Sequence, residues 1–421
     1  MIGLKRFFGK VQLSKKAADI IARESKTNAQ NYAPLPVVIA KAEGAYVWDV
    51  DGKKYLDCIG SFSAMNQGHL HPRIKKAIVK QMDSATLMGR GVYHDKLADA
   101  TDFLTKTFGY DRVILMNTGV EAGETAIKFA RRWGYEVKGI PPHQAHVLFA
   151  NGNFWGRTIA ACGSSDDPDR YTNFGPFGLN FKLFDYNDAD AFEREIKANP
   201  NVAAIMLEPI QGEACVVIPD EDFFKKIRKI CDDNKVLLIV DEVQTGLGRT
   251  GKLLCQEHWN IRGDLVTLGK ALSGGFFPVS AVLGTNDVFQ VVVPGSHGST
   301  FGGSPLAAVA AVESVKVVIE EGLAENSAKM GEYVLEGLKK ELKGNAYVSK
   351  LRGKGLFIAF NIDESNGPQM KDLCLEIIEK GVLVKNPKPT KLRIAPALNI
   401  TKADADIIIS TLSSVLNKYG K

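Results

Sequence analysis

Six short apolar runs between residues 113 and 283 constrain the fold of this 421-residue chain more than any other feature. They span residues 113–116, 146–150, 202–207, 236–240, 265–268 and 279–283. Segments with the apolar spacing of amphipathic helices, such as 222–234, separate most of these runs. This alternation predicts an α/β fold with a mostly parallel central sheet flanked by helices.

The length predicts more than one domain, because 421 residues exceed what one hydrophobic core usually holds. We expect an N-terminal segment at residues 1–60, a large domain at 61–321 and a small α+β C-terminal domain at 322–421. A β-hairpin around Asp51-Gly52 is expected in the first segment, which would pack with the small domain. Within the small domain, we predict helices at 323–342, 369–380 and from 401, and strands at 351–362, 382–385 and 392–394.

Composition excludes several classes of function. A net charge of +5, spread along the chain, gives no electrostatic case for nucleic-acid binding. No apolar run is long enough to span a membrane. Six scattered cysteines without a C-x-x-C favour an intracellular compartment with reduced thiols. We expect no metal site, since His69 and His71 lack a third nearby ligand.

The basic N-terminus, residues 1–26, has no long apolar core and is therefore not a secretory signal. It fits either the remnant of an organellar transit peptide or an N-terminal helix. The compartment thus stays open between the cytoplasm and the mitochondrial matrix.

Lys270 directly follows the end of a predicted buried strand, 265–268, and precedes the flexible Ser273-Gly-Gly275. Ligands of open α/β sheets lie beyond the carboxyl ends of the strands, so this lysine points towards the expected site. A lysine in such a place is suited to form an imine with an aldehyde. An isolated lysine is more often a solvated charge, so the neighbouring motifs decide between the two readings.

Two other strand ends carry groups that suit a phosphorylated, flat cofactor. The turn at 117–119 opens a helix, whose free amides and positive end attract phosphate. Asp241 ends the most hydrophobic strand, where a buried carboxylate needs a cation such as a pyridinium nitrogen. An ordinary helix cap at the turn and a turn-capping role for Asp241 are the alternatives.

Five motifs follow one another along the chain at strand ends. They are Asn-Thr-Gly-Val-Glu-Ala at 117–122, Asn-Phe-Trp-Gly-Arg-Thr at 153–158, Glu-Pro-Ile-Gln-Gly-Glu at 208–213, Asp-Glu-Val-Gln-Thr-Gly at 241–246 and Gly-Lys-Ala-Leu-Ser-Gly-Gly at 269–275. In this order they resemble the fold-type I, class III pyridoxal-phosphate-dependent aminotransferases, and the resemblance covers nearly the whole chain. Within the family, the chain is most similar to the members that act on ornithine.

The resemblance implies roles for the residues of the cofactor site. Lys270 would bind the aldehyde of pyridoxal 5'-phosphate and shuttle a proton during catalysis, and Asp241 would pair with the pyridine nitrogen. The other cofactor contacts implied are Gln244 at the ring hydroxyl, Phe154 on the ring face, and Gly119 and Val120 at the phosphate. Ser299 and Thr300 would reach the phosphate of a neighbouring subunit, so that a homodimer completes the site.

The resemblance also implies how two different small molecules, an amino acid and a keto acid, share one pocket. Arg157 and Arg393 would clamp the two carboxylates of 2-oxoglutarate. Glu213 would pair with Arg393 while ornithine reacts, and Tyr32 would hold the carboxylate end of ornithine. The expected reaction is therefore a ping-pong transfer of the δ-amino group of L-ornithine to 2-oxoglutarate, giving glutamate 5-semialdehyde and glutamate.

Two positions depart from the pattern of the ornithine-specific members. Phe62 stands where they typically carry a tyrosine that contacts the substrate, and Cys215 stands where glycine is usual. Both affect the choice of amino donor rather than the cofactor chemistry. N-acetylornithine and 4-aminobutyrate are the alternative donors, a non-catalytic relative is a second alternative, and a nicotinamide oxidoreductase is disfavoured because no G-x-G-x-x-G follows the first strands.

Overall fold

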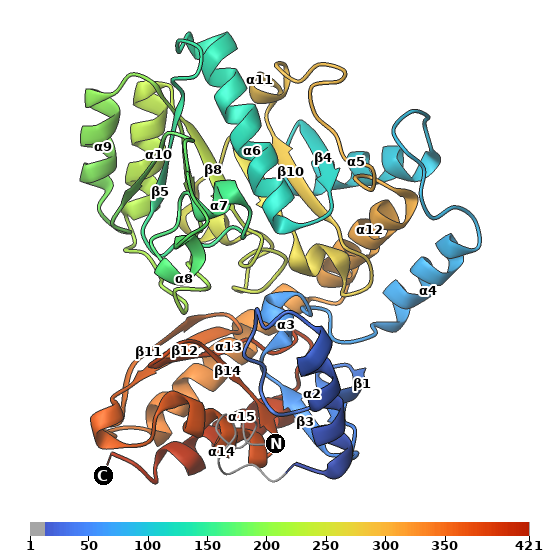
Figure 1. Cartoon of the computed structure of the whole chain (residues 1–421), viewed down its shortest axis with the longest axis vertical. Coiled ribbons are helices and arrows are strands. Elements are labelled where there is room, and N and C mark those ends of the chain that lie inside the picture. Colours follow the sequence, from blue (N-terminus) through green and yellow to red (C-terminus); the bar gives the residue numbers. More distant parts are fainter. Residues whose placement is uncertain (1–12, 421) are drawn as a thin grey trace.

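The computed structural model describes residues 13–420. The chain folds into two compact parts, which lie one above the other in Figure 1. A seven-stranded sheet in the order β4-β10-β9-β8-β7-β5-β6 forms the centre of the upper body, the large domain. Its strands are β4 (Arg112–Met116), β5 (His146–Ala150), β6 (Phe181–Phe184), β7 (Val202–Leu207), β8 (Leu237–Asp241), β9 (Leu265–Leu268) and β10 (Ser280–Gly284). Only β10 runs antiparallel to its neighbours, so the mostly parallel sheet is confirmed.

Helices cover both faces of this sheet because each strand buries alternate side chains on opposite faces. On one face, Phe129 and Trp133 of α6 pack with Val147 and Phe149 of β5. On the other face, α9, α10 and α12 pack around residues such as Leu148. The helices of this domain are α4 (Pro72–Met82), α5 (Asp95–Phe108), α6 (Gly119–Trp133), α7 (Ile159–Cys162), α8 (Pro168–Tyr171), α9 (Ala189–Ala198), α10 (Phe223–Asn234), α11 (Asn286–Phe289) and α12 (Pro305–Glu320), with shorter turns η1 (Gly134–Lys138), η2 (Cys255–Trp259) and η3 (Lys270–Ser273).

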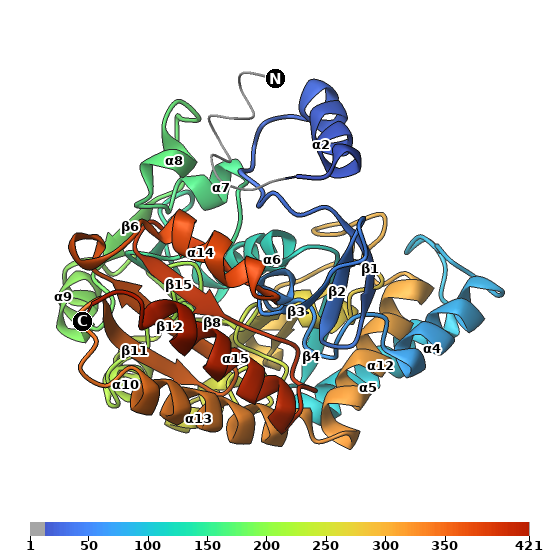
Figure 2. The ribbon, with the colours of Figure 1, turned by 90° about the horizontal axis from the view of Figure 1, so that it is seen from below.

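The lower body, the small domain, contains two four-stranded sheets, seen from below in Figure 2. One has the order β11-β12-β15-β14 and is covered by α13 (Leu323–Glu341), α14 (Met370–Glu379) and α15 (Lys402–Leu416). Its strands are β11 (Val348–Lys354), β12 (Phe357–Ile362), β14 (Lys385–Lys388) and β15 (Lys391–Ile394), and a short turn, η4 (Glu364–Asn366), follows β12.

The second sheet of the small domain combines three strands from the N-terminal part of the chain with one strand from its C-terminal part. It contains β1 (Ile39–Glu43), β2 (Tyr46–Asp49), β3 (Lys54–Asp57) and β13 (Val382–Leu383). The hairpin predicted around Asp51-Gly52 is formed by β2 and β3, and β13 pairs with β3 in parallel. We propose domain boundaries near residues 60 and 321, since the first strands share a sheet with the C-terminal part.

Two predicted strands of the small domain were wrong in extent. The run at 351–362 is two antiparallel strands, β11 and β12, because Gly355 takes a left-handed conformation (φ +57°) that turns the chain. The run at 382–385 divides between β13 and β14, which belong to different sheets. The edge strand β6 was not predicted at all.

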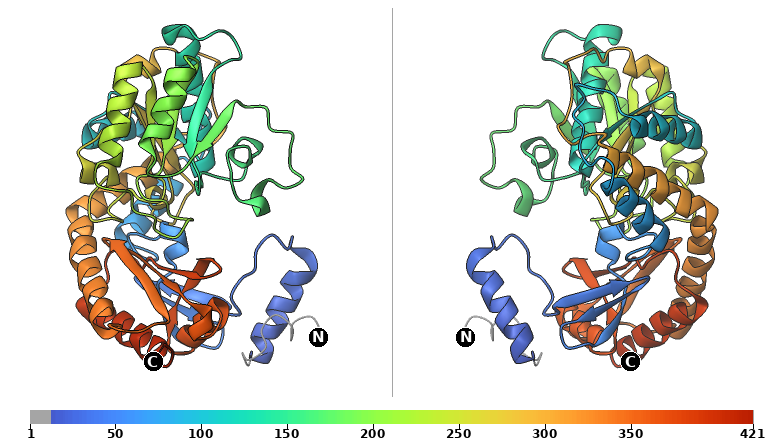
Figure 3. Two further views of the ribbon diagram at one scale, coloured as in Figure 1. Left: turned by 90° about the vertical axis from the view of Figure 1, so that its left-hand side faces the viewer. Right: turned by 90° about the vertical axis from the view of Figure 1, so that its right-hand side faces the viewer.

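Helix α2 (Lys15–Thr27) stands at the periphery of the molecule in both views of Figure 3. Ala17 is its only buried residue, and the side chain of Ser14 caps its first turn. The first twelve residues of the basic N-terminal stretch lie outside the described part. No helix within residues 13–420 is long and apolar enough to cross a membrane.

Candidate active site

Lys270 begins η3 directly after β9, at the carboxyl end of the sheet. Its backbone is left-handed (φ 44°), a conformation that is uncommon for a residue with a side chain and that recurs at active sites. Burial lowers the pKa of its amine, while Glu213 and Asp241 act in the opposite direction. A larger fraction of the amine is thus neutral and nucleophilic than in an exposed lysine.

Asp241 closes β8, next to β9, and is 5% exposed. Its Oδ1 accepts hydrogen bonds from the amide of Val243 (3.0 Å) and the hydroxyl of Thr267 (2.8 Å). Its Oδ2 accepts none from the described residues. Burial raises the pKa of this carboxyl, so a cation placed at Oδ2 would be strongly favoured.

The turn before α6 offers unused donors beside Lys270. Thr118 and Glu121 cap the helix reciprocally, but the amides of Gly119 and Val120 make no hydrogen bond with the described residues. A Cβ built on Gly269 would lie 3.5 Å from the Cα of Gly119, so this turn adjoins the lysine segment. Free amides at the start of a 15-residue helix suit a phosphate.

Phe154 and Glu208 complete this side of the site. The amide of Phe154 donates to Oε1 of Glu208 at 2.9 Å, and the amide of Gly212 donates to Oε2 at 3.1 Å. Burial, together with the nearby Asp241, raises the pKa of Glu208 to about 8. Glu208 therefore fixes the backbone of two site loops at once.

Glu213, Gln244 and Arg393 form a hydrogen-bonded triangle. Nη1 of Arg393 donates to Oε1 of Glu213 at 2.9 Å and to Oε1 of Gln244 at 3.2 Å. Nε2 of Gln244 donates to Oε1 of Glu213 at 3.2 Å. Burial alone would raise the pKa of Glu213, but Arg393 and then Lys270 lower it to about 2. The pair is thus ionised throughout the neutral range.

Gly212 is required by this triangle. A Cβ at this position would lie 1.5 Å from Oε1 of Gln244, so the Gln244 side chain could not keep its place in the triangle. Its carbonyl also accepts from Nη1 of Arg393 at 2.7 Å. The short motif Gln-Gly-Glu therefore needs glycine for close approach.

The two departures from the family pattern both lie on strained backbone. Ser61, Phe62 and Ser63 are left-handed in succession, with φ between 46° and 71°. The ring of Phe62 lies 5.9 Å from the guanidinium carbon of Arg393, and its carbonyl accepts from Nε2 of Gln244. Cys215 has φ 76°, a conformation that favours glycine, and it is fully buried.

The structure brings most predicted site residues together. Three of the polar side chains among them, however, are exposed to solvent in the single chain. Arg157 is exposed, with its guanidinium carbon 5.8 Å from the ring of Phe154. Tyr32 is 62% exposed and makes no side-chain hydrogen bond within residues 13–420. Thr300 is likewise exposed and unbonded in that range, whereas Oγ of Ser299 accepts from Nδ2 of Asn117 at 2.8 Å.

The residues present fit pyridoxal 5'-phosphate on observations of this chain alone. A buried amine, Lys270, suits its aldehyde, and the unshared Oδ2 of Asp241 suits its ring nitrogen. The free amides before α6 suit its phosphate. The donor set therefore covers three separate functional groups of one molecule.

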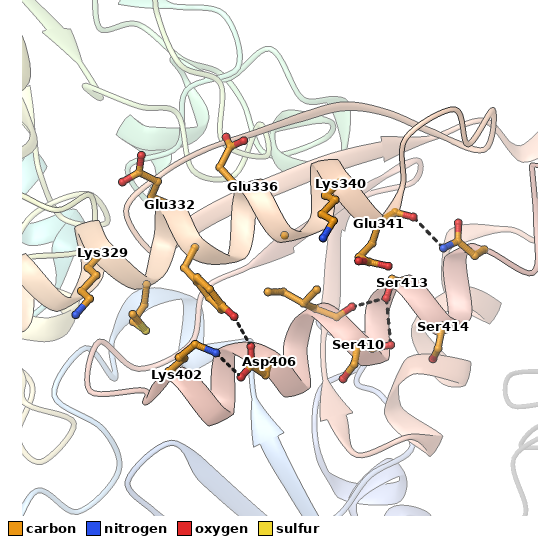
Figure 4. Close-up of a pocket in the computed structure, with 15 residues that line it drawn as sticks. Lys329, Glu332, Glu336, Lys340, Glu341, Lys402, Asp406, Ser410, Ser413 and Ser414 are labelled. Atoms are coloured by element: carbon orange, nitrogen blue, oxygen red, sulfur yellow. Dashed lines mark hydrogen bonds and ion pairs between the residues drawn. The ribbon is translucent and has the colours of Figure 1, made fainter.

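A small enclosed cavity of about 20 Å³, enough for one water molecule, lies at the site. Phe62, Lys385 and Arg393 are among its lining residues. A much larger groove, of about 1160 Å³, lies on the small domain between α13 and α15 (Figure 4). None of the site residues lines that groove, so the size of a groove or cavity does not identify the active site in this structure.

Sequence reasoning missed three side chains at the site: Glu208, Arg170 and Lys385. Glu208 was visible only as the start of its motif. Arg170 lies over the ring of Phe154, and Lys385 is the cross-strand neighbour of Arg393. Neither has a signal in the sequence, because an isolated charged residue is usually a solvated surface charge and only the folded chain shows its neighbours.

Comparison with known proteins agrees with this geometry. The family model for class-III aminotransferases matches residues 27–416. The probable mitochondrial ornithine aminotransferase of Caenorhabditis elegans is 49% identical over 404 residues, which is 95% of this chain and 94% of that protein. The crystal structure of ornithine aminotransferase from Toxoplasma gondii ME49 superposes with a TM-score of 0.94 at 43% identity, covering 99% of this chain and 97% of that one.

Two further structures bear on the site. Another structure of the Toxoplasma gondii enzyme describes partial occupancy of PLP at its active site. The acetylornithine aminotransferase of Elizabethkingia anophelis has a TM-score of 0.88 at 42% identity, over 96% of this chain and all of that one. The match to the family model and the identity to curated relatives, both over more than nine-tenths of the chain, make this protein an enzyme of the class-III aminotransferase family.

Proposed function

We propose that the protein transfers the δ-amino group of L-ornithine to 2-oxoglutarate, giving glutamate 5-semialdehyde and glutamate. The semialdehyde then cyclises to pyrroline-5-carboxylate. The ion pair between Glu213 and Arg393, close to Lys270, carries this proposal within the site. The relatives at 47–49% identity named as ornithine aminotransferases support it independently.

The cofactor would be held by residues of four segments. Lys270 would bind its aldehyde, Asp241 would pair with its ring nitrogen and Gln244 would reach its ring hydroxyl. Phe154 would stack on its ring, while the amides of Gly119 and Val120 would bind its phosphate. When bound, pyridoxal 5'-phosphate supplies an aldehyde that captures amines and a ring that accepts electrons from a broken C–H bond.

Lys270 carries the acid and base work, and Asp241 would support it by pairing with the ring nitrogen of the cofactor. Nζ of Lys270 removes the proton from Cδ of ornithine in the first half-reaction. In the second half-reaction the same nitrogen delivers a proton to the carbon that becomes Cα of glutamate. The lowered pKa of Lys270 keeps its amine able to accept a proton near neutral pH.

Glu213 decides which amino group of ornithine reacts. While it neutralises Arg393, the α-carboxylate finds no free guanidinium near Lys270, so the δ-amine enters instead. A dicarboxylate competes with Glu213 for Arg393, because a bidentate carboxylate pair is among the strongest charge-assisted contacts. Arg157, exposed and free of ion pairs within residues 13–420, binds the second carboxylate, and Tyr32 holds the carboxylate end of ornithine.

A second copy of the chain would complete each site through Thr300, with Ser299 beside it. The exposed hydroxyl of Thr300 supports this, as does a group of exposed apolar side chains close to it. This group comprises Leu87, Met88, Val92, Tyr93 and Phe301. Nε2 of His94 lies 2.8 Å from the carbonyl of Gly303, which places the two segments side by side. Large exposed apolar patches usually mark protein interfaces.

We also propose an intracellular setting. All six cysteines are unpaired and buried, as expected where thiols stay reduced.

The direct test is product formation by the purified protein with pyridoxal 5'-phosphate, ornithine and 2-oxoglutarate. The wild type should form pyrroline-5-carboxylate, and Lys270→Ala should lose about 10³-fold or more of kcat, since one positioned proton carrier contributes 10²–10⁴-fold and the nucleophile is lost as well. Lys76→Ala, which changes an exposed lysine of α4, is the matched control. Full activity of Lys270→Ala would refute the mechanism.

A further inference from the structure

Three charged side chains connect the small domain to the ring of Phe154. Nζ of Lys388, in β14, lies 3.0 Å from Oδ2 of Asp167 in the large domain. Nε of Arg170 lies 3.3 Å from the same oxygen. The guanidinium carbon of Arg170 is 4.7 Å from the ring centre of Phe154, within the range of a cation–π attraction.

The guanidinium of Arg170 is fixed from several sides. Its Nη1 donates to the carbonyl of Asn153 at 3.0 Å, directly before Phe154 in the chain. Oδ1 of Asp167 accepts from the amide of Asp169 at 3.2 Å, which holds that carboxylate at the start of α8. The Arg170 side chain is 10% exposed, so water competes little for these contacts. The arginine is therefore an ordered part of the wall behind Phe154.

Arg157 is the natural comparison, because it approaches the same ring. Its guanidinium carbon lies farther from the ring centre, at 5.8 Å, and the residue is exposed. Its side chain forms no ion pair with the residues from 13 to 420. Arg157 is therefore available to bind a substrate, whereas the guanidinium of Arg170 is held by contacts within the protein.

We propose that Arg170 is a positioning residue for Phe154, and that Asp167 and Lys388 tie this arginine to the small domain. The inference rests on the proposed function, in which Phe154 lies against the cofactor ring. A ring already held in place loses little conformational freedom when the cofactor binds, which favours binding. Displacement of the small domain would weaken that support, because Lys388 shares the carboxylate that holds Arg170.

The test is the affinity of the apoenzyme for pyridoxal 5'-phosphate, followed by quenching of protein fluorescence, together with the visible circular dichroism of the bound cofactor. Arg170→Met should weaken binding about 3-fold to 30-fold and alter the dichroic band, as expected for the loss of a buried cation–π contact. Arg170→Lys, which keeps the cation, should recover part of the affinity. Arg194→Met, which changes an exposed arginine of α9, is the matched control and should bind the cofactor as the wild type does.

The link to the small domain is tested by Lys388→Met. Alone it should weaken cofactor binding about 2-fold to 5-fold, and combined with Arg170→Met it should add nothing, because both act through the same arginine. If Arg170→Met does not fold, Asp167→Asn replaces it and should weaken binding in the same direction.

Three outcomes would count against the account. Wild-type affinity and an unchanged dichroic band in Arg170→Met, or in Asp167→Asn where the first does not fold, would overturn the positioning role. Full additivity in the double variant would overturn the link to the small domain. A wild-type protein that does not bind pyridoxal 5'-phosphate would instead refute the proposed function.

Discussion

Nη1 of Arg393 lies 2.9 Å from Oε1 of Glu213, and both side chains are mostly buried. Arg393 lies in strand β15 of the small domain, and Glu213 lies on a loop after strand β7 of the large domain. The contact therefore couples the two domains within the candidate active site. Because a buried ion pair is strongly destabilised when one partner is removed, its displacement requires a ligand that replaces the lost charge.

Replacing Glu213 should change which amino group reacts. In Glu213→Ala the guanidinium of Arg393 is free to bind an α-carboxylate, so attack by the α-amino group of glutamate or ornithine becomes favoured. The measurement is the ratio of pyrroline-5-carboxylate to the isomeric product of α-transamination, formed from ornithine. Glu221→Ala, an exposed carboxylate of the same segment, is the control. An unchanged product ratio in Glu213→Ala would refute the switch.

The pair should also affect stability at low pH. The pKa of Glu213 is about 2 in the folded protein, below its ordinary value of 4.5. A depressed carboxyl pKa contributes stability above pH 4.5, which is lost as the pH falls towards 2. The contribution is at most about 3 kcal/mol. The difference in free energy of unfolding between the wild type and Glu213→Gln should thus be constant above pH 5 and shrink below pH 4, and a difference independent of pH would contradict the assignment.

Gly212→Ala should disrupt the triangle of Glu213, Gln244 and Arg393. The new Cβ would overlap Oε1 of Gln244, which must move away. Overpacking of this kind costs about 1–3 kcal/mol of stability, and kcat/KM should fall for both half-reactions because Gln244 also serves the cofactor. Gly178→Ala is the matched control, since no atom lies within 4 Å of its added Cβ. Equal kinetics in the two variants would show that close packing at Gly212 is unimportant.

Phe62→Tyr introduces the hydroxyl that the resemblance to ornithine-specific members leads us to expect at this position. One added hydrogen bond to the substrate contributes about 0.5–1.5 kcal/mol, so kcat/KM for ornithine should rise about 2-fold to 10-fold. The gain should be smaller for 5-aminovalerate, which lacks the α-amino group. An equal gain for both donors would show that the hydroxyl does not contact the α-amino group.

The central strands were predictable because the sheet is buried on both faces, which requires continuous apolar runs in the sequence. Residues 146–150, 202–207 and 265–268 match β5, β7 and β9 residue for residue. Strand β6 was not predicted because it is a short edge strand with a partly exposed face. Its pattern of apolar and polar residues therefore does not differ from that of a loop.

The site was predictable where its residues lie at the ends of those strands. Asp241 ends β8 and Lys270 lies two residues after β9, and these strands are neighbours in the sheet, so the proximity of the two residues follows from topology. Arg170 and Lys388 carry no such signal, since their roles depend on how a loop of one domain meets a strand of the other. Tyr32 and Thr300 remain predictions that involve contacts beyond the single chain or its present conformation.

The most direct test of the central claim is the ornithine half-reaction, measured with the cofactor-loaded enzyme alone. The visible absorbance of the bound cofactor is followed after mixing with L-ornithine, N-acetylornithine or 4-aminobutyrate. The ratio of the limiting rate to the apparent Kd should be at least about 10-fold higher for ornithine, equivalent to about 1.4 kcal/mol of discrimination. A higher ratio for N-acetylornithine or 4-aminobutyrate would contradict the account.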